Sequence, residues 1–312
     1  MKKRILSVCL VLALCLAIGP AALAANSADD PTKVTDGNAA WGEAANETWY
    51  VVDGDVTIQD RIEVTGTVNL TLADSATLTT QQGIHVPEGS SLIIWDQSGH
   101  TGALSAHGGV DQSGIGSNSG ETSGDITIHG GVIYAVGDSG HAGGAAAIGG
   151  GHNGSAGDIA ITGGTIIAIG GSDGDDASGA SAIGGGHNGG TGDITITGGT
   201  ITAKAGDSDT PAIGATPEFD GFEHMTYGND TSNTSTDAVV ERTGQESDDW
   251  SQWHWVRIMP LGGGSAVTQE DETPTETAPK TGDGTEILPW LLLMALSSVG
   301  LVTVLRRRGR AK

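Results

Sequence analysis

Acidic side chains that recur at equivalent places in a repeated sequence are the residues best suited to chemistry. Each repeat carries a Gly-Asp-Ile tripeptide, and a second acidic position follows in the loop after the repeat's last strand. Carboxylates stacked roughly 5 Å apart repel one another, and Ca²⁺ would relieve this because it binds several oxygens at once. We therefore expect candidate calcium ligands in these loops, the alternative being that the loops splay apart. The leading positions are Asp125, Asp158 and Asp193, and the candidate ligands are Asp138, Asp173, Asp175, Asp176, Asp207 and Asp209.

Two histidines recur in the same repeats, in a setting that favours structure over chemistry. His152 and His187 each stand in the sequence Gly-Gly-Gly-His-Asn-Gly. Glycine turns that stack on one another would place both rings at the same corner of successive coils. We interpret the pair as a stacked corner, with a metal or catalytic role as the alternative.

Polysaccharide cleavage is the reaction class to test against these residues. A lyase of the pectate type needs a basic residue to take a proton, yet no Lys or Arg occurs between Arg61 and Lys204. A glycosidase needs two carboxylates on one face at a catalytic separation. The sequence shows no acid pair with a basic residue near it. We expect that the protein is not an enzyme.

The elements that must position these residues are short strands separated by glycine turns. Apolar residues alternate over four to six positions, which is the strand period. Three such strands per repeat predict an all-β fold, a right-handed parallel β-helix (solenoid), with a left-handed helix as the alternative. Alternation assigns the inward columns as Ile126/Ile128, Ile159/Ile161, Ile194/Ile196, Ile133/Ile166/Ile201 and Ala135/Ala168/Ala203.

The same alternation points Tyr134, Val136, Ile167 and Ile169 outward. An apolar patch on a polar rod usually marks a contact, so Tyr134 and Ile167 are candidate ligand-surface residues. The alternative is that the aromatic-rich segment 217–261 folds back over them.

Segment 217–261 differs from the repeats because it is rich in aromatic residues. A solenoid has open ends, so a terminal cap is expected there, with Trp250, Trp253 and Trp255 in it. The alternative is that these tryptophans form a sugar-stacking platform, which makes them candidate ligand-surface residues too.

The remaining segments are organised around export. Residues 1–24 have a basic start, an apolar run and an Ala-Leu-Ala end, as in a signal peptide. Both cysteines, Cys9 and Cys15, lie within it, so the mature chain would have no disulfide. A polar, loosely ordered leader (25–48) in which Trp41 is the residue expected to dock precedes the β-helix repeats (49–216).

A linker (262–278) leads to a three-part C-terminal signal (279–312). Pro279-Lys280-Thr281-Gly282 precedes an apolar run and a basic tail. This order resembles the sortase-dependent sorting signals of Gram-positive surface proteins, although Ala278 stands where Leu is usual. The resemblance implies that sortase joins Thr281 to peptidoglycan, after the C-terminal transmembrane helix has held the chain in the membrane. A simple membrane anchor is the alternative.

The repeats themselves resemble the Gly-rich β-helix surface proteins of Gram-positive bacteria, some of which are described as carbohydrate-binding. The formal net charge is -24, which makes nucleic acid and anionic polysaccharide poor partners. We therefore expect a secreted, cell-wall-anchored module that binds carbohydrate or adheres to an extracellular glycan or host surface. The alternatives are a structural stalk without a specific ligand and a polysaccharide-degrading enzyme.

Overall fold

The computed structural model describes residues 26–140, 143–172, 179–219, 222–228, 239–241, 250 and 253–260. They all belong to one compact unit, Met1–Ser265, and a second unit comprises Ala266–Lys312. The described chain is all-β, and its strands join in a 19-stranded, mostly parallel sheet. Within these ranges no helix is long and apolar enough to cross a membrane.

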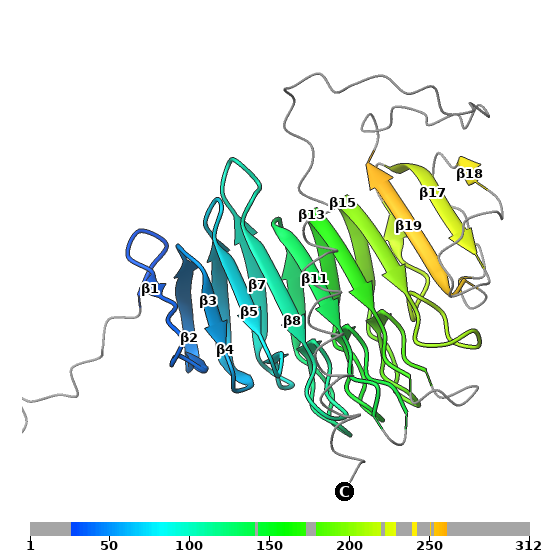
Figure 1. Cartoon of the computed structure of the whole chain (residues 1–312), viewed down its shortest axis with the longest axis horizontal. Coiled ribbons are helices and arrows are strands. Elements are labelled where there is room, and N and C mark those ends of the chain that lie inside the picture. Colours follow the sequence, from blue (N-terminus) through cyan, green and yellow to red (C-terminus); the bar gives the residue numbers. More distant parts are fainter. Residues whose placement is uncertain are drawn as a thin grey trace, which may run out of the picture. The chain divides into compact units, whose positions relative to one another are not determined.

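The strands form three ladders, and the chain visits each ladder once per coil. The first ladder is parallel throughout, and the strands that pair in it run in the order β1 (Thr32–Lys33), β2 (Ala40–Val52), β4 (Ile62–Leu72), β7 (Ser91–Asp96), β10 (Asp125–Ile128), β13 (Ile159–Ile169), β15 (Ile194–Lys204) and β16 (Glu218–Phe219). Figure 1 shows successive strands side by side from β2 to β15.

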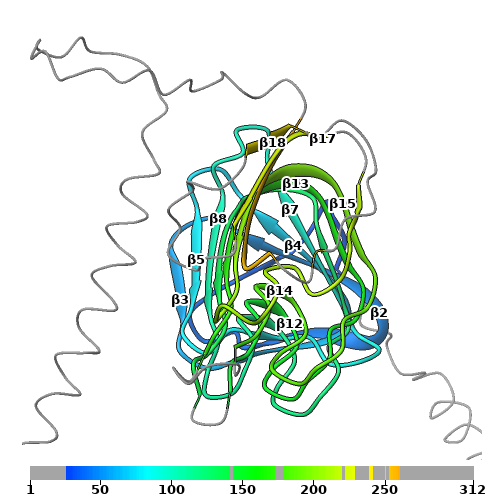
Figure 2. The same ribbon diagram turned by 90° about the vertical axis from the view of Figure 1, so that its right-hand side faces the viewer.

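The second ladder follows the first along each coil. It contains β3 (Val56–Ile58), β5 (Thr77–Thr80), β8 (Ala103–His107), β11 (Val132–Val136) and the second halves of β13 and β15. The third ladder closes the coil with very short strands, the starts of β2 and β4 and then β6 (Ile84–His85), β9 (Ile115–Gly116), β12 (Ile148–Gly149) and β14 (Ile183–Gly184). Figure 2 looks along the stack, and the coils enclose a common interior.

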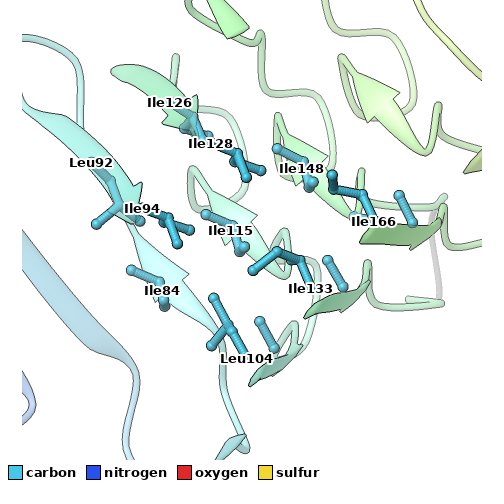
Figure 3. Packing of buried hydrophobic residues seen from close by; sticks show 14 of the residues in the cluster. Ile84, Leu92, Ile94, Leu104, Ile115, Ile126, Ile128, Ile133, Ile148 and Ile166 are labelled. Carbon is cyan, nitrogen blue, oxygen red and sulfur yellow. The ribbon is translucent and has the colours of Figure 1, made fainter. Parts of the chain in front are cut away.

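This interior is filled by apolar side chains from all three ladders, stacked coil on coil. In the first ladder Ile128 pairs with Ile161, which pairs with Ile196, and all three are fully buried. Figure 3 shows such columns from all three ladders converging on one core. The inward columns predicted from alternation are confirmed in the first and second ladders. A coil cannot bury its apolar residues alone, so neighbouring coils stabilise one another.

Glycine is required where the third ladder turns. Gly116, Gly149 and Gly184 have φ values of 139°, 125° and 137°, which side chains rarely adopt. A Cβ on Gly149 would lie 2.1 Å from the carbonyl oxygen of Gly184 in the next coil. The repeated Ile-Gly pair thus combines a buried isoleucine with a corner that only glycine fits.

The leading aspartates join one coil to the next. The amide N–H of Asp158 donates to Oδ1 of Asp125 at 3.3 Å, and the amide N–H of Asp193 donates to Oδ1 of Asp158 at 3.0 Å. Ser123 Oγ accepts a similar bond from the Gly157 amide at 3.0 Å. The recurring Gly-Asp-Ile tripeptide therefore satisfies backbone donors at a corner of the solenoid.

The C-terminal end of the stack changes from parallel to antiparallel pairing. Strand β19 (Trp255–Pro260) pairs antiparallel with β15 in the second ladder, and β17 (Phe222–Gly228) pairs with β19 and with β18 (Val239–Glu241). These antiparallel strands end the parallel repeat. The backbone groups of the last second-ladder strand pair with β19, so they are not free to pair with another chain. This is the role expected of a cap.

The N-terminal coil begins before the predicted boundary at residue 49. Residues 40–48 belong to β2, and Ala40–Gly42 pair in parallel with β4. Trp41 is 1% exposed and stacks on Tyr50 with ring centroids 5.4 Å apart. The expected docking of Trp41 is observed. Residues 40–48, which were expected to be part of a loosely ordered leader, belong instead to the first coil, where the Trp41 ring packs.

Candidate functional site

One outer face of the solenoid combines hydroxyl, aromatic and aliphatic side chains in strict register. On the second ladder the outward position passes from coil to coil through residues that pair directly with one another. We call this column and the outward residues beside it the second-ladder face. The column is Thr57, Thr79, Ser105, Tyr134, Ile167 and Thr202.

Tyr134 is the aromatic centre of the second-ladder face. Its ring lies 5.7 Å from that of His107 at an angle of 57°, and His107 Nε2 is 3.2 Å from Ser105 Oγ. Burial lowers the pKa of His107 and raises the pKa of Tyr134. Both side chains are therefore uncharged at neutral pH.

The second-ladder face carries no carboxylate, although the chain is strongly acidic. The described strands of the second ladder from β3 to β15, and β19 at its end, contain no Asp or Glu in that ladder, and the first acids beyond them are Glu223 on β17 and Glu241 on β18. Its formal charges are Lys204 at the end of β15 and Arg257 on β19. A surface whose strands carry no carboxylate from β3 to β15, on a protein of net charge -24, sets this side apart from the rest of the molecule.

Tyr134 and Ile167 point outward and are partly exposed, as the alternation predicted. The described strands of the cap do not lie over them, because β19 extends the second ladder at its edge. The alternative in which segment 217–261 covers this patch is thus not seen in the part of the cap that the structure describes.

The cap tryptophans occupy a different environment from the one a platform needs. Trp250, Trp253 and Trp255 are 3%, 7% and 7% exposed, and the rings of Trp250 and Trp253 meet at 4.5 Å. Rings this deeply buried pack the end of the core and cannot stack on a sugar from solvent. The platform alternative is therefore corrected in favour of packing.

A second aromatic row lies on the outer side of the first ladder. Trp49 and Trp95 stack with ring centroids 6.2 Å apart, and Trp95 stacks on His129 at 4.0 Å. Trp95 Nε1 donates to Asn69 Oδ1 at 3.0 Å, and Asn69 donates to Glu47 at 2.8 Å. Because Trp95 and His129 cover each other's facing sides, this row serves to hold successive coils together.

A polar cluster, the Glu63–His85–Glu121 centre, lies on the third ladder and the loop beside it. His85 Nδ1 is 2.5 Å from Glu63 Oε2, and His85 Nε2 is 3.0 Å from Glu121 Oε2. The imidazole is nearly buried, whereas both carboxylates are about half exposed. Each ring nitrogen thus faces one carboxylate oxygen, and a ring nitrogen that carries hydrogen can donate to the carboxylate that it faces.

Arg61 holds the backbone around this centre in place through hydrogen bonds. Its guanidinium donates to the carbonyl oxygens of Gln82 and Ser113 at 2.6 and 3.0 Å, and to those of Gly116 and Ser117 at 3.3 and 3.2 Å. Burial lowers the pKa of Arg61 to about 10, which still leaves it charged at neutral pH. Its bonds reach from one coil to the next two, so it positions the loop that carries Glu121.

This centre sets an acid pair near a basic residue, a combination that was not expected from the sequence. Glu63 and His85 are 22 residues apart, a shorter interval than in the later repeats. The signal that could have found it is the match between Ile62-Glu63-Val64 and Ile84-His85-Val86, which aligns the two polar positions.

Of the candidate calcium ligands that the structure describes, Asp138 and Asp207 accept hydrogen bonds from backbone amides, and Asp209 contributes its amide to Asp207. Asp138 Oδ2 accepts the Asp111 amide at 2.9 Å, and Asp207 accepts the amides of Gly179 and Asp209. Burial alone would raise the pKa of Asp207, but these hydrogen bonds, with those from Thr210, lower it. Among the described residues no three His, Cys, Asp or Glu side chains are arranged so that they could hold a metal ion, and Asp173, Asp175 and Asp176 fall outside the described residues.

The recurrent histidines form the stacked corner that the sequence predicted. The rings of His152 and His187 are parallel within 2° and lie 5.9 Å apart. Asn188 Nδ2 donates to Asn153 Oδ1 at 3.1 Å beside them. The corner is a ladder of equivalent residues.

The segments that carried the localisation argument, 1–24 and 279–312 with Pro279, Lys280, Thr281 and Gly282, lie outside the described residues. Comparison with protein-family models, with curated protein sequences and with solved structures gave no match.

Proposed function

We propose that this protein is a cell-wall-anchored surface protein whose solenoid binds an extracellular glycan through the second-ladder face. The observation that carries the proposal is the uncharged outer column of Ser105, Tyr134, Ile167 and Thr202, with His107 beside it, on an otherwise acidic molecule. Glycans are bound by aromatic rings that pack on C–H faces and by hydroxyl and imidazole groups that bond their hydroxyls.

The fold that supports this function is, in our proposal, a right-handed parallel β-helix closed by a C-terminal β cap. The three ladders, each visited once per coil, support the helix, and the antiparallel pairing of β19 supports the cap. Such a rod presents a flat outer face several strands long, as a ligand larger than a single sugar needs.

Anchoring rests on the tripartite signal at 279–312 together with the export signal at 1–24. Thr281→Ala should leave the protein extractable by detergent, whereas the unmodified chain should remain covalently bound in the wall fraction, joined to peptidoglycan by sortase. Lys280→Ala is a control that keeps the cleavage pair. Equal wall retention of Thr281→Ala would refute sorting at this residue.

Binding can be tested on a glycan array with the purified chain. Tyr134→Ala should lose most of the signal because the ring supplies the largest apolar contact of the face, and Trp49→Ala, on the first ladder, should keep it once folding is verified. Repeating the array with Ca²⁺ and with EDTA tests whether calcium assists binding through the aspartate loops. Binding that survives Tyr134→Ala unchanged would refute the assignment to this face.

The alternative function is a structural stalk without a specific ligand. The interlocked aspartate corners and the aromatic row on the first ladder favour it, because both serve stability alone. A folded chain that binds nothing on the array would support the stalk.

A further inference from the structure

We propose that the second-ladder face takes a linear, uncharged glycan that runs along the stacking axis and contacts successive coils. This inference rests on the proposed function and adds the class of the ligand and its direction. It follows from three properties of the face: its register, its chemistry and its charge.

The register of the second ladder provides one equivalent contact per coil. The column pairs residue by residue through the six coils, from Thr57 to Thr202. Neighbouring strands lie about 4.8 Å apart, so the column extends over five spacings, or roughly 24 Å. An extended chain of pyranose rings advances by a similar step per sugar, so one sugar can face each coil.

The chemistry of the column suits a polymer with hydroxyl groups and C–H faces. Five of its members carry a hydroxyl, and Ile167 supplies an aliphatic contact between Tyr134 and Thr202. Tyr134 is partly exposed and lies near the middle of the column, next to Ile167. A sugar at this position would meet the ring while its neighbours along the chain meet hydroxyls.

The face is uncharged except at its C-terminal end, where Lys204 and Arg257 lie, and this favours an uncharged ligand along the column. The described second-ladder strands contain no carboxylate, and both His107 and Tyr134 are neutral at neutral pH. A polyanion is repelled by the net charge of -24, and a polycation is drawn instead to the carboxylates elsewhere on the chain. An uncharged chain pays no such penalty and gains the contacts of the face.

The direction follows from what borders the face. Along β11 the outward side chains are Val132, Tyr134 and Val136, and the strand then ends just before the loop that contains Asp138. A chain laid parallel to the strands would leave the face after these contacts and reach the acidic corner. A chain laid across the strands stays on uncharged residues from Thr57 to Thr202, beyond which the column continues to Arg257.

The test uses uncharged β-1,4-linked glucan, mannan and xylan oligomers of two to six sugars, with galacturonan and chitosan oligomers as charged counterparts. Calorimetry with the full chain should show affinity for one uncharged series that rises at least about tenfold from disaccharide to hexasaccharide, since each added contact contributes. Thr79→Ala and Thr202→Ala should each weaken hexasaccharide binding about fivefold, because one hydrogen bond is lost. Disaccharide binding at Tyr134 should not change.

Thr195→Ala, an outward residue on the first ladder, is the matched control and should leave both ligands unaffected. Affinity that is independent of length, or unaffected by Thr79→Ala and Thr202→Ala while Tyr134→Ala still abolishes binding, would overturn the axial chain and leave the proposed function standing. Tighter binding of either charged series would overturn the uncharged class. Failure of every sugar to bind would refute the proposed function itself, and with it this inference.

Discussion

Replacing Gly149 by alanine tests the physical basis of the coil directly. The new Cβ would lie 2.1 Å from the carbonyl oxygen of Gly184, 3.0 Å from Cβ of Ala156, and at a φ of 125°. Such a backbone conformation costs a non-glycine residue about 1–3 kcal/mol. Forcing the neighbouring backbone aside in a packed core costs about 1–3 kcal/mol more. We expect Gly149→Ala to lower the free energy of unfolding by about 2–6 kcal/mol.

Urea unfolding followed by circular dichroism measures this loss as a lower midpoint at unchanged slope. Gly54→Ala is the matched control, because a Cβ there meets nothing within 4 Å and its φ is not in the left-handed range. That variant should be neutral or more stable by up to about 1 kcal/mol, since alanine restricts the unfolded chain. A wild-type midpoint for Gly149→Ala, or an equal loss in both variants, would refute the close contact between coils.

Three further perturbations follow from the same structure. Ile161→Asp buries a charge with no partner and should abolish cooperative folding, whereas Thr195→Asp, outward on the same ladder, should change the melting temperature by a few degrees at most; similar losses would contradict the assignment of faces. The lowered pKa of Asp207 means that its carboxylate stabilises the fold above its ordinary pKa of 3.8, and that this is lost as the pH falls through the lower native value. The stability difference between wild type and Asp207→Asn should therefore be full at neutral pH and shrink below 3.8, and a pH-independent difference would argue against it. Arg61→Met removes the guanidinium donor from four carbonyl oxygens, of which those of Gly116 and Ser117 keep the amides of Val86 and Ser113 as donors. It should cost about 2 kcal/mol or more in urea unfolding, against less than about 0.5 kcal/mol for the exposed Arg257→Met; equal costs would mean that the hydrogen bonds of Arg61 contribute nothing.

Much of the fold could be predicted from the sequence because the same alternation and spacing recur in each coil. Alternation placed Ile161 beneath Ile196 and Tyr134 beside Ile167, and both pairs are observed. The information is local: a period-two pattern sets the face, and a constant spacing sets the register. The stacking of His152 on His187 follows from the same regularity.

The remaining features depend on where that regularity fails. His85 meets Glu63 and Glu121 because an early coil is shorter than the later ones, and nothing within one strand reveals that difference. The cap tryptophans were open to two interpretations because an aromatic-rich segment reads alike whether it is buried or exposed. The second-ladder face was also not predictable from any one strand, because its outer column takes one residue from each of six strands that are separated in the sequence by turns and by the other two ladders.

The corner bonds of the leading aspartates make adjoining coils interchangeable. At each junction between these later coils, the carboxylate of one leading aspartate accepts the amide N–H of the next. Each coil therefore carries both the donor and the acceptor that this hydrogen bond requires. Deleting residues 158–192 would remove one whole coil and bring Asp125 opposite Asp193 with an equivalent bond available. Duplicating them would lengthen the rod by about 4.8 Å without a new kind of contact. The reach of such a protein can therefore change by recombination between its own repeats, while its ends and core chemistry stay the same.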